Sequence, residues 1–286
     1  MMSFRSFVLA AFVLCAGNMP AHAQSTATPQ REYRVLLVGN NLTYTNNLPA
    51  LLRAVGASQG TSITTETYAA PGGTLAERRH DGHAANALRA RKFDAVLLQE
   101  QGGRLAACPA SSVEQRKAPC AASMHAYRDL ASTARDSGAT VLLFNTWTAD
   151  DRSQARITRS TRMLAEKNGA RVFNAASAID AMRKAQPGTN PYPDGTHPST
   201  QASLMLALVL YRDITGTAPL AKDLIVTAPL LPVNAAVSAA SPMESQLGLT
   251  GEGKAVMVPA SLLTPLVKAI PEAKTSGEMD PSRRRR

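Results

Sequence analysis

The chain lacks a long hydrophobic run beyond its N-terminal segment. The one apolar run there covers residues 7–16, behind Arg5, and Ala21-His22-Ala23 follows it. A basic residue, a short apolar run and a small-x-small motif are typical of a secretory signal peptide, which we predict over residues 1–23. A membrane anchor is the alternative, but the run is too short for a bilayer core of about 30 Å. We therefore expect a secreted or periplasmic protein without a membrane span after signal removal, starting with a linker over 24–33.

The chain also lacks a basic stripe with aromatic residues between the charges. Its formal charge is +10, but Arg5 and the terminal run from Arg283 to Arg286 supply part of it. The other basic residues are scattered among acidic ones, and aromatic residues make up only 5% of the chain. Nucleic-acid-binding proteins combine a basic surface with side chains that stack on bases. The sequence therefore argues against nucleic acid as a partner.

Cysteine is scarce, with three residues in the chain. Cys15 lies in the predicted signal peptide, which leaves Cys108 and Cys120 on either side of a polar segment. Because an exported chain folds in an oxidising compartment, we predict a disulfide between them, with two independent thiols as the alternative. Their spacing and the lack of histidine partners argue against a metal site, and we expect no metal.

What the chain does contain is an alternation of short aliphatic runs and helical stretches from residue 34 to about residue 215. Short buried strands separated by helices indicate a parallel sheet covered on both faces. We therefore predict an α/β domain over residues 34–217. The expected strands are 34–38, 62–68, 95–98, 140–144 and 171–174, and the expected helices are 48–59, 84–91, 121–137, 152–167, 175–184 and 200–215.

The alternation ends beyond residue 217. Seven prolines between Pro219 and Pro271 interrupt pieces rich in alanine and leucine. Proline breaks helices and central strands, so regular structure is harder to predict there. We expect a partly ordered extension over 218–274 that packs on the core, and a disordered basic tail over 275–286.

Two segments far apart in the sequence carry candidate chemistry. The first strand runs into a sharp turn at Gly39-Asn40-Asn41, where many α/β hydrolases place a nucleophilic serine. Downstream, Asp194 and His197 are three residues apart in a turn. That spacing lets the carboxylate reach Nδ1 of the ring while Nε2 faces outward, which is what a hydroxyl nucleophile requires of its base. The turn, however, holds Asn41 where the serine is expected.

Together these segments resemble the SGNH (GDSL-like) hydrolase superfamily. The first block of one branch reads Gly-Asn-Ser-x-Thr-x-x-Asn-x-Leu-Pro, and this chain has Gly39-Asn40-Asn41-Leu42-Thr43-Tyr44-Thr45-Asn46-Asn47-Leu48-Pro49. Gly72-Gly73-Thr74-Leu75 resembles the second block, Leu97-Leu98-Gln99-Glu100-Gln101 stands at the third, and Asp194 to His197 at the last. The resemblance covers about residues 34–215. It implies a three-layer α/β/α, flavodoxin-like fold with a five-stranded parallel sheet, and ester hydrolysis that needs no cofactor.

The resemblance also implies roles for individual residues. His197 would be the general base and Asp194 its orienter. The oxyanion would be held by the backbone N–H of Asn41, by Gly73 and by a glutamine of the third block. Both Gln99 and Gln101 are candidates, because this chain lacks the Gly-x-Asn-Asp form common there, and a structural role is the alternative for each.

Other polar and aromatic residues near these blocks invite a functional interpretation. Asn40 is expected to line the substrate cleft. Trp147, after the fourth strand, is expected there too, as a stacking surface for a sugar or an acyl group, with plain packing as the alternative. His80 and His83 flank a polar turn, which we interpret as a solvated loop and not as a metal site.

Asn41 leads to two hypotheses about the function of the chain. A carboxamide has no proton that His197 can remove to make an oxygen nucleophile, so the covalent route is closed. One hypothesis is an exported ester hydrolase-like protein, acting on an acylated carbohydrate, lipid or small ester and impaired by Asn41. The other is a non-catalytic protein that retains the cleft to bind an ester or a glycan.

Overall fold

A computed structural model describes residues 31–108, 119–250 and 255–270. The predicted signal peptide over 1–23 and the predicted tail over 275–286 lie outside these residues. Within the described ranges, no helix is both long enough and apolar enough to cross a membrane.

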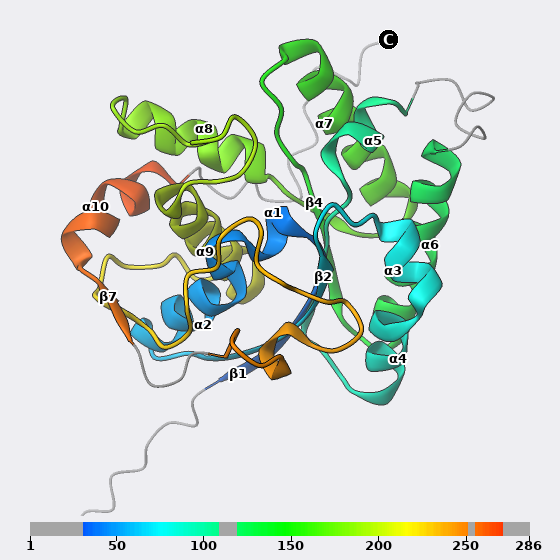
Figure 1. The fold of residues 1–286 in the computed structure, drawn as a ribbon, viewed down its shortest axis with the longest axis horizontal. Helices are drawn as coiled ribbons and strands as arrows, with labels where there is room; N and C mark the ends of the chain where they lie inside the picture. Colours follow the sequence, from blue (N-terminus) through cyan, green and yellow to red (C-terminus); the bar gives the residue numbers. More distant parts are fainter. Residues whose placement is uncertain (1–30, 109–118, 251–254, 271–286) are drawn as a thin grey trace, which may run out of the picture. The chain divides into compact units, whose positions relative to one another are not determined.

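The centre of the fold is a five-stranded sheet in which every neighbouring pair is parallel (Figure 1). Its strands are β1 (Glu32–Asn40), β2 (Ser62–Ala70), β3 (Ala95–Leu98), β4 (Thr140–Phe144) and β5 (Arg171–Phe173), in the order β2-β1-β3-β4-β5. The predicted α/β fold with a five-stranded parallel sheet is confirmed. The strand order reverses at β1, and ligands of such sheets bind beyond the carboxyl ends of the strands at the reversal.

Helices cover both faces of the sheet because alternate residues of each strand point to opposite sides. Val35 and Leu37 of β1 belong to one apolar core, whereas Leu36 and Val38 belong to the other. The first core includes α2 (Leu48–Ser58), α8 (Ala175–Ala185) and α9 (Thr200–Thr215). The second includes α3 (Leu75–Asp81), α4 (His83–Ala90), α5 (Gly102–Ala106), α6 (Cys120–Asp136) and α7 (Asp151–Lys167). The two sets of helices lie on opposite sides of the sheet in Figure 1.

Several short helices were not predicted from the sequence. They are α1 (Asn41–Tyr44), the 3-10 turn η1 (Thr45–Asn47), α3 and α5. The start of α3 did carry a readable signal: Thr74 accepts from the Glu77 N–H, and the Glu77 carboxylate accepts from the Thr74 N–H, which is a capping box. The other pieces span too few residues to show a helical period.

A disulfide joins Cys108 to Cys120, with their Cα atoms 5.2 Å apart. This confirms the predicted pairing. Cys108 follows α5 and Cys120 begins α6, so the bond ties these two helices on one face of the sheet. The segment between them, 109–118, lies outside the described residues.

The C-terminal segment packs on the first of the two cores. It contains β6 (Leu224–Val226), the turn η3 (Met243–Ser245), β7 (Val256–Val258) and α10 (Ala260–Ala269), and β6 pairs with β7 as an antiparallel ribbon. Leu224 and Val226 of β6 and Leu263 and Leu266 of α10 are fully buried in that core. These apolar side chains are what keep the segment in place despite its prolines.

Glu244 of this segment covers the exposed edge of the sheet. β2 is an edge strand, so its outer backbone groups have no neighbouring strand. Glu244 accepts hydrogen bonds from the Thr67 N–H (2.8 Å) and from the hydroxyls of Thr65 (2.8 Å) and Thr67 (2.7 Å). Arg53 lies 3.7 Å from the same carboxylate. One acidic side chain therefore satisfies a backbone N–H and two hydroxyls of this edge strand.

The same segment also holds the residues that follow Asn41. The Tyr44 hydroxyl donates to the Val233 carbonyl (2.7 Å), and the Asn46 N–H donates to the Leu231 carbonyl (2.8 Å). The Asn47 side chain donates to the Pro229 carbonyl (2.9 Å). Tyr44 is fully buried in a small apolar cluster with Leu231 and other residues of this segment. In Figure 1 the segment, in yellow and orange, runs across α1 and β2.

Replacing Glu244 with alanine is expected to lower the free energy of unfolding by about 2 kcal/mol, because it leaves the donors of β2 partly buried without an acceptor. Urea unfolding followed by circular dichroism measures the change. Glu166→Ala, at an exposed position on α7, is the matched control and should have little effect. Equal midpoints for the two variants would contradict the role given to Glu244.

Candidate active site

The turn after β1 is held by hydrogen bonds to the end of β3. The Asn40 N–H donates to Oε1 of Gln99 (2.9 Å), and the Thr43 hydroxyl donates to the same oxygen (2.9 Å). Asn40 caps α1, because its Oδ1 accepts from the Leu42 N–H (3.0 Å). A Cβ at Gly39 would overlap with the Thr43 hydroxyl and the Gln99 amide, so only glycine fits there. This arrangement puts Asn41 at the start of α1, past the carboxyl end of β1.

Asp194 and His197 form a hydrogen-bonded pair in the loop before α9. Oδ2 of Asp194 lies 2.6 Å from Nδ1 of His197, and Oδ1 accepts from the backbone N–H groups of Thr196 (3.0 Å) and His197 (2.8 Å). The His197 N–H, then that of Thr196, then the imidazole lower the pKa of Asp194 to about 2. The carboxylate therefore stays ionised at neutral pH and can fix the orientation of the imidazole.

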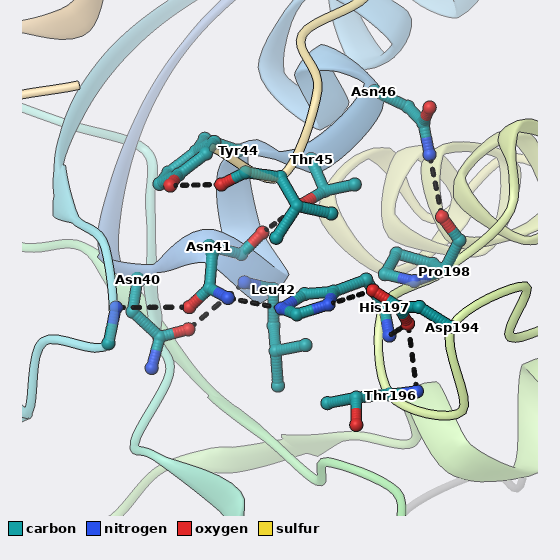
Figure 2. A network of polar contacts seen from close by, with 12 residues as sticks. Asn40, Asn41, Leu42, Tyr44, Thr45, Asn46, Asp194, Thr196, His197 and Pro198 are labelled. Carbon is teal, nitrogen blue, oxygen red and sulfur yellow. Dashed lines mark hydrogen bonds and ion pairs between the residues drawn. The ribbon is translucent and has the colours of Figure 1, made fainter. Parts of the chain in front are cut away.

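The side chain of Asn41 lies against this pair, as Figure 2 shows. Its Nδ2 contacts Nε2 of His197, and its Oδ1 accepts from the Gly72 N–H at 3.2 Å. Because an amide nitrogen only donates, Nε2 must be the acceptor, and the ring proton must then sit on Nδ1, facing Asp194. This is the tautomer that a general base requires, but its lone pair is already used by Asn41.

The two glycines of the second block have different roles in the structure. The Gly73 N–H donates to the Ala70 carbonyl (3.1 Å), so it does not point into the site. Gly72, with φ of +64°, is exposed and points its N–H at Asn41. The sequence predicted Gly73 as the oxyanion donor, whereas the N–H that lies beside Asn41 belongs to Gly72. Adjacent glycines cannot be distinguished from sequence, since the choice depends on their φ angles.

The two glutamines of the third block also have different positions and contacts. Gln99 is fully buried under the turn, where its Nε2 donates to the Glu100 carbonyl (2.7 Å) and its Oε1 holds Asn40 and Thr43. Gln101 is exposed at the site, and its amide nitrogen has no partner among the described residues. Of the two candidates, only Gln101 presents a side-chain donor to a ligand.

Glu100, between them, is fully buried and links the two loops that flank the site. Its Oε1 accepts from the N–H groups of Leu75 (3.2 Å) and Gln101 (2.8 Å). Leu75 follows the loop that carries Gly72, so one carboxyl group fixes the positions of both candidate donor loops. Burial raises the pKa of Glu100.

Two further residues hold the loop that carries His197. The Asn46 side chain, in η1, donates to the Pro198 carbonyl (2.8 Å) and to the Ser203 hydroxyl (3.0 Å). Trp147 Nε1 donates to the Thr196 carbonyl (2.7 Å). Asn46 was not predicted as a site residue. Its φ of +56° is a conformation that asparagine tolerates better than most residues, but neither the angle nor the contact can be read from sequence.

A cavity of about 540 Å³ opens over these groups. It is lined by residues from all four blocks, among them Asn40, Asn41, Gly72, Gln101, Trp147 and His197. A second cavity of about 700 Å³ shares Trp147, Thr148 and Ala149 with the first and is also lined by residues of α7, α8 and the loop after α8. The ring of Trp147 stacks on that of Tyr192, with centroids 5.4 Å apart. Trp147 is thus a shared wall of both cavities.

Two histidines outside this site, His80 and His83, were considered in the sequence as a possible metal site. His83 stacks on Tyr68, with centroids 6.5 Å apart, and His80 is exposed at the end of α3. Within the described part of the chain, no group of three or more histidine, cysteine, aspartate or glutamate residues is placed to hold a metal ion.

Comparisons by structure find proteins with a similar fold, while no family model and no curated protein matches the chain. An acetylxylan esterase from Geobacillus stearothermophilus, Axe2, is 13% identical with a TM-score of 0.50, covering 65% of this chain and 95% of its own. A DUF4886 family protein from Bacteroides uniformis is 16% identical with a TM-score of 0.51, covering 65% of this chain and 84% of its own. A candidate SGNH hydrolase from Slackia heliotrinireducens is 21% identical with a TM-score of 0.48, covering 64% and 98%. At these identities the likeness concerns the fold, which this chain shares with the esterase Axe2.

The low pKa of Asp194 predicts that its carboxyl group is still ionised at a pH of about 3. Because the folded-state pKa is depressed below 3.8, the pair stabilises the fold above that pH, and the effect is lost as the pH falls through about 2. A carbon NMR titration of the Asp194 carboxyl group measures this. In His197→Ala the two backbone donors remain, so the midpoint should still lie below 3.8. A midpoint near 3.8 in the unsubstituted protein would contradict the prediction.

Proposed function

We propose that this chain is an exported SGNH-type protein that resembles an ester hydrolase, binds an acylated ligand and is impaired in hydrolysis. The observation that carries the proposal is the position of the Asn41 side chain. Its Nδ2 contacts Nε2 of His197, and its Oδ1 accepts a hydrogen bond from the Gly72 N–H. In a serine hydrolase the base and the oxyanion donor serve the nucleophile and the substrate carbonyl. Here one neutral side chain engages both.

Some hydrolysis remains chemically open to this site. Once Asn41 swings aside, His197 has an oriented ring and a cavity from which to activate water. Sites without their nucleophile retain catalysis of about 10³–10⁴-fold over water from the oxyanion donors and binding alone. We therefore expect slow turnover through water and not an acyl-enzyme.

A second candidate is a binding protein without catalytic function. The contacts of Asn41 favour it, because a ligand can occupy the cleft without any proton transfer to His197. The two candidates share the same cleft and differ only in whether the bound ester is cleaved.

Two features support an acylated carbohydrate as the ligand, ahead of a lipid or another small ester. The fold is shared with Axe2, described as an acetyl-xylooligosaccharide esterase, which is 13% identical to this chain. Within the chain, the two cavities that share Trp147 give room for a ligand longer than one acyl group. The second cavity is lined by polar side chains such as Gln154 and Asn190 and by the ring of Tyr192, a lining suited to sugar hydroxyls and ring faces.

The disulfide between Cys108 and Cys120 supports export. Such bonds persist in the periplasm and outside the cell, where thiols are not kept reduced. It agrees with the signal peptide predicted over residues 1–23.

Replacing Asn41 with serine is expected to raise hydrolysis of p-nitrophenyl acetate by about 10²-fold or more, since serine restores a proton for His197 to remove. Initial rates of the mature protein, Asn41→Ser, His197→Ala and the double variant measure this. The double variant should lose the gain.

Two outcomes of that experiment would contradict the proposal. If Asn41→Ser folds but gains nothing, the site is not assembled for ester hydrolysis. If the unsubstituted protein is already a fast esterase and His197→Ala alone abolishes the activity, then Asn41 does not impair the site. Melting temperatures of all four proteins serve as the folding control.

Trp147 is the one tryptophan of the chain, so its fluorescence reports on the wall between the cavities. We expect acetylated xylo-oligosaccharides to change this fluorescence on titration. Tyr192→Ala should weaken binding about tenfold through loss of ring contact, and Tyr192→Phe should restore it. If neither acetylated nor unmodified oligosaccharides bind, the ligand is not a carbohydrate ester.

A further inference from the structure

We propose that Asn41 slowly hydrolyses at its own side-chain amide, with His197 as the catalyst, and becomes aspartate. This inference goes beyond the proposed function and needs no ester ligand. It rests on the placement of the two ends of the carboxamide. Oδ1 accepts from the N–H of Gly72 at 3.2 Å. Nδ2 contacts the imidazole of His197, as Figure 2 shows.

These two contacts place an N–H donor beside the carbonyl oxygen and an imidazole beside the amide nitrogen, which at rest donates to Nε2. The carbonyl oxygen needs a donor that stabilises the developing negative charge, and the leaving nitrogen needs a group that delivers a proton. The Gly72 N–H faces the first atom and Nε2 of His197 faces the second. Asp194 holds the ring at 2.6 Å in the tautomer that leaves Nε2 ready to accept a proton.

Water reaches this amide from the cavity of about 540 Å³, which Asn41 and His197 both line. A water molecule there displaces Nδ2 from the ring nitrogen and gives its proton to Nε2 as its oxygen bonds to Cγ of Asn41. The Cγ–Oδ1 electron pair moves onto Oδ1, beside the Gly72 N–H. His197 then passes the proton to Nδ2, the Cγ–Oδ1 double bond re-forms as the Cγ–Nδ2 bond breaks, and ammonia leaves and takes up the proton of the new carboxylic acid. The sum is asparagine plus water giving aspartate plus ammonium, with no oxidant or further reactant.

The common route of asparagine deamidation is disfavoured at this position. In that route the backbone nitrogen of the next residue attacks the side chain, and the cyclic imide opens to a mixture of aspartate and isoaspartate. The Leu42 N–H instead donates to Oδ1 of Asn40 at 3.0 Å, within the first turn of α1. The product at residue 41 should therefore be aspartate alone.

Asn40 is a control built into the same loop. Its carboxamide also makes two hydrogen bonds, donating to the Gly73 carbonyl (2.9 Å) and accepting from the Leu42 N–H. Neither partner is an acid or a base. If hydrogen bonding or burial alone caused hydrolysis, Asn40 would react as well, whereas the proposal assigns the reaction to Asn41.

The test is a prolonged incubation of the purified full-length mature protein at neutral pH, followed by peptide mass mapping. We expect the mass shift of one deamidation to accumulate at Asn41, with Asn40 unchanged and without isoaspartate. In His197→Ala and in Asp194→Asn the rate at Asn41 should fall, by about 10²-fold for the loss of the base. Melting curves of both variants show that the fold is retained. Incubation in ¹⁸O-labelled water marks the new carboxylate oxygen.

Two results would overturn the inference. One is that Asn41 of the folded protein remains an amide throughout the incubation, although the asparagines of an unfolded peptide with the same sequence deamidate under the same conditions. The other is a mixture of aspartate and isoaspartate whose rate is the same in His197→Ala, which would assign the change to the backbone route. Neither readout depends on an ester, so failure here is distinguishable from failure of the proposed function.

Discussion

The site depends on one buried side chain, that of Gln99. Its Oε1 accepts two hydrogen bonds from the turn after β1. The chain turns sharply after β1 inside the protein, where a backbone N–H without a partner would be costly. Gln99 supplies that partner to Asn40 and also fixes Thr43 in the next turn. Because Gln99 directly follows β3, the turn is tied to the carboxyl end of the neighbouring strand. The direction of the Asn41 side chain, and therefore its contact with His197, follows from this bond.

Much of the fold could be predicted from the sequence, because the central strands are short, aliphatic runs separated by helical periods. The pairing of Cys108 with Cys120 could be predicted as well. Details within the blocks could not. The choice between Gly72 and Gly73 depends on a φ angle, and the choice between Gln99 and Gln101 depends on which side chain turns inward. Both are decided by contacts with residues 30 or more positions away, which no local pattern records.

Asn41 shows how one functional group can preserve the geometry of a site while changing its chemistry. Asparagine makes the contacts that keep His197 and Gly72 in position, and its amide fixes the imidazole in the tautomer of a base. A smaller apolar residue would leave both groups without a partner. Asparagine at position 41 is therefore compatible with an ordered cleft, and the pair of Asp194 and His197 alone is weak evidence for activity. Binding and hydrolysis have to be measured separately for this chain.

The contacts between the C-terminal segment and the turn have a consequence for biosynthesis. Tyr44, Asn46 and Asn47 lie near the start of the chain, but their partners Val233, Leu231 and Pro229 are translated almost two hundred residues later. A nascent or truncated chain that stops before these residues has the strands of the sheet and the motif of the first block without the support that holds them. We therefore expect a chain truncated before residue 229 to lack an ordered first block.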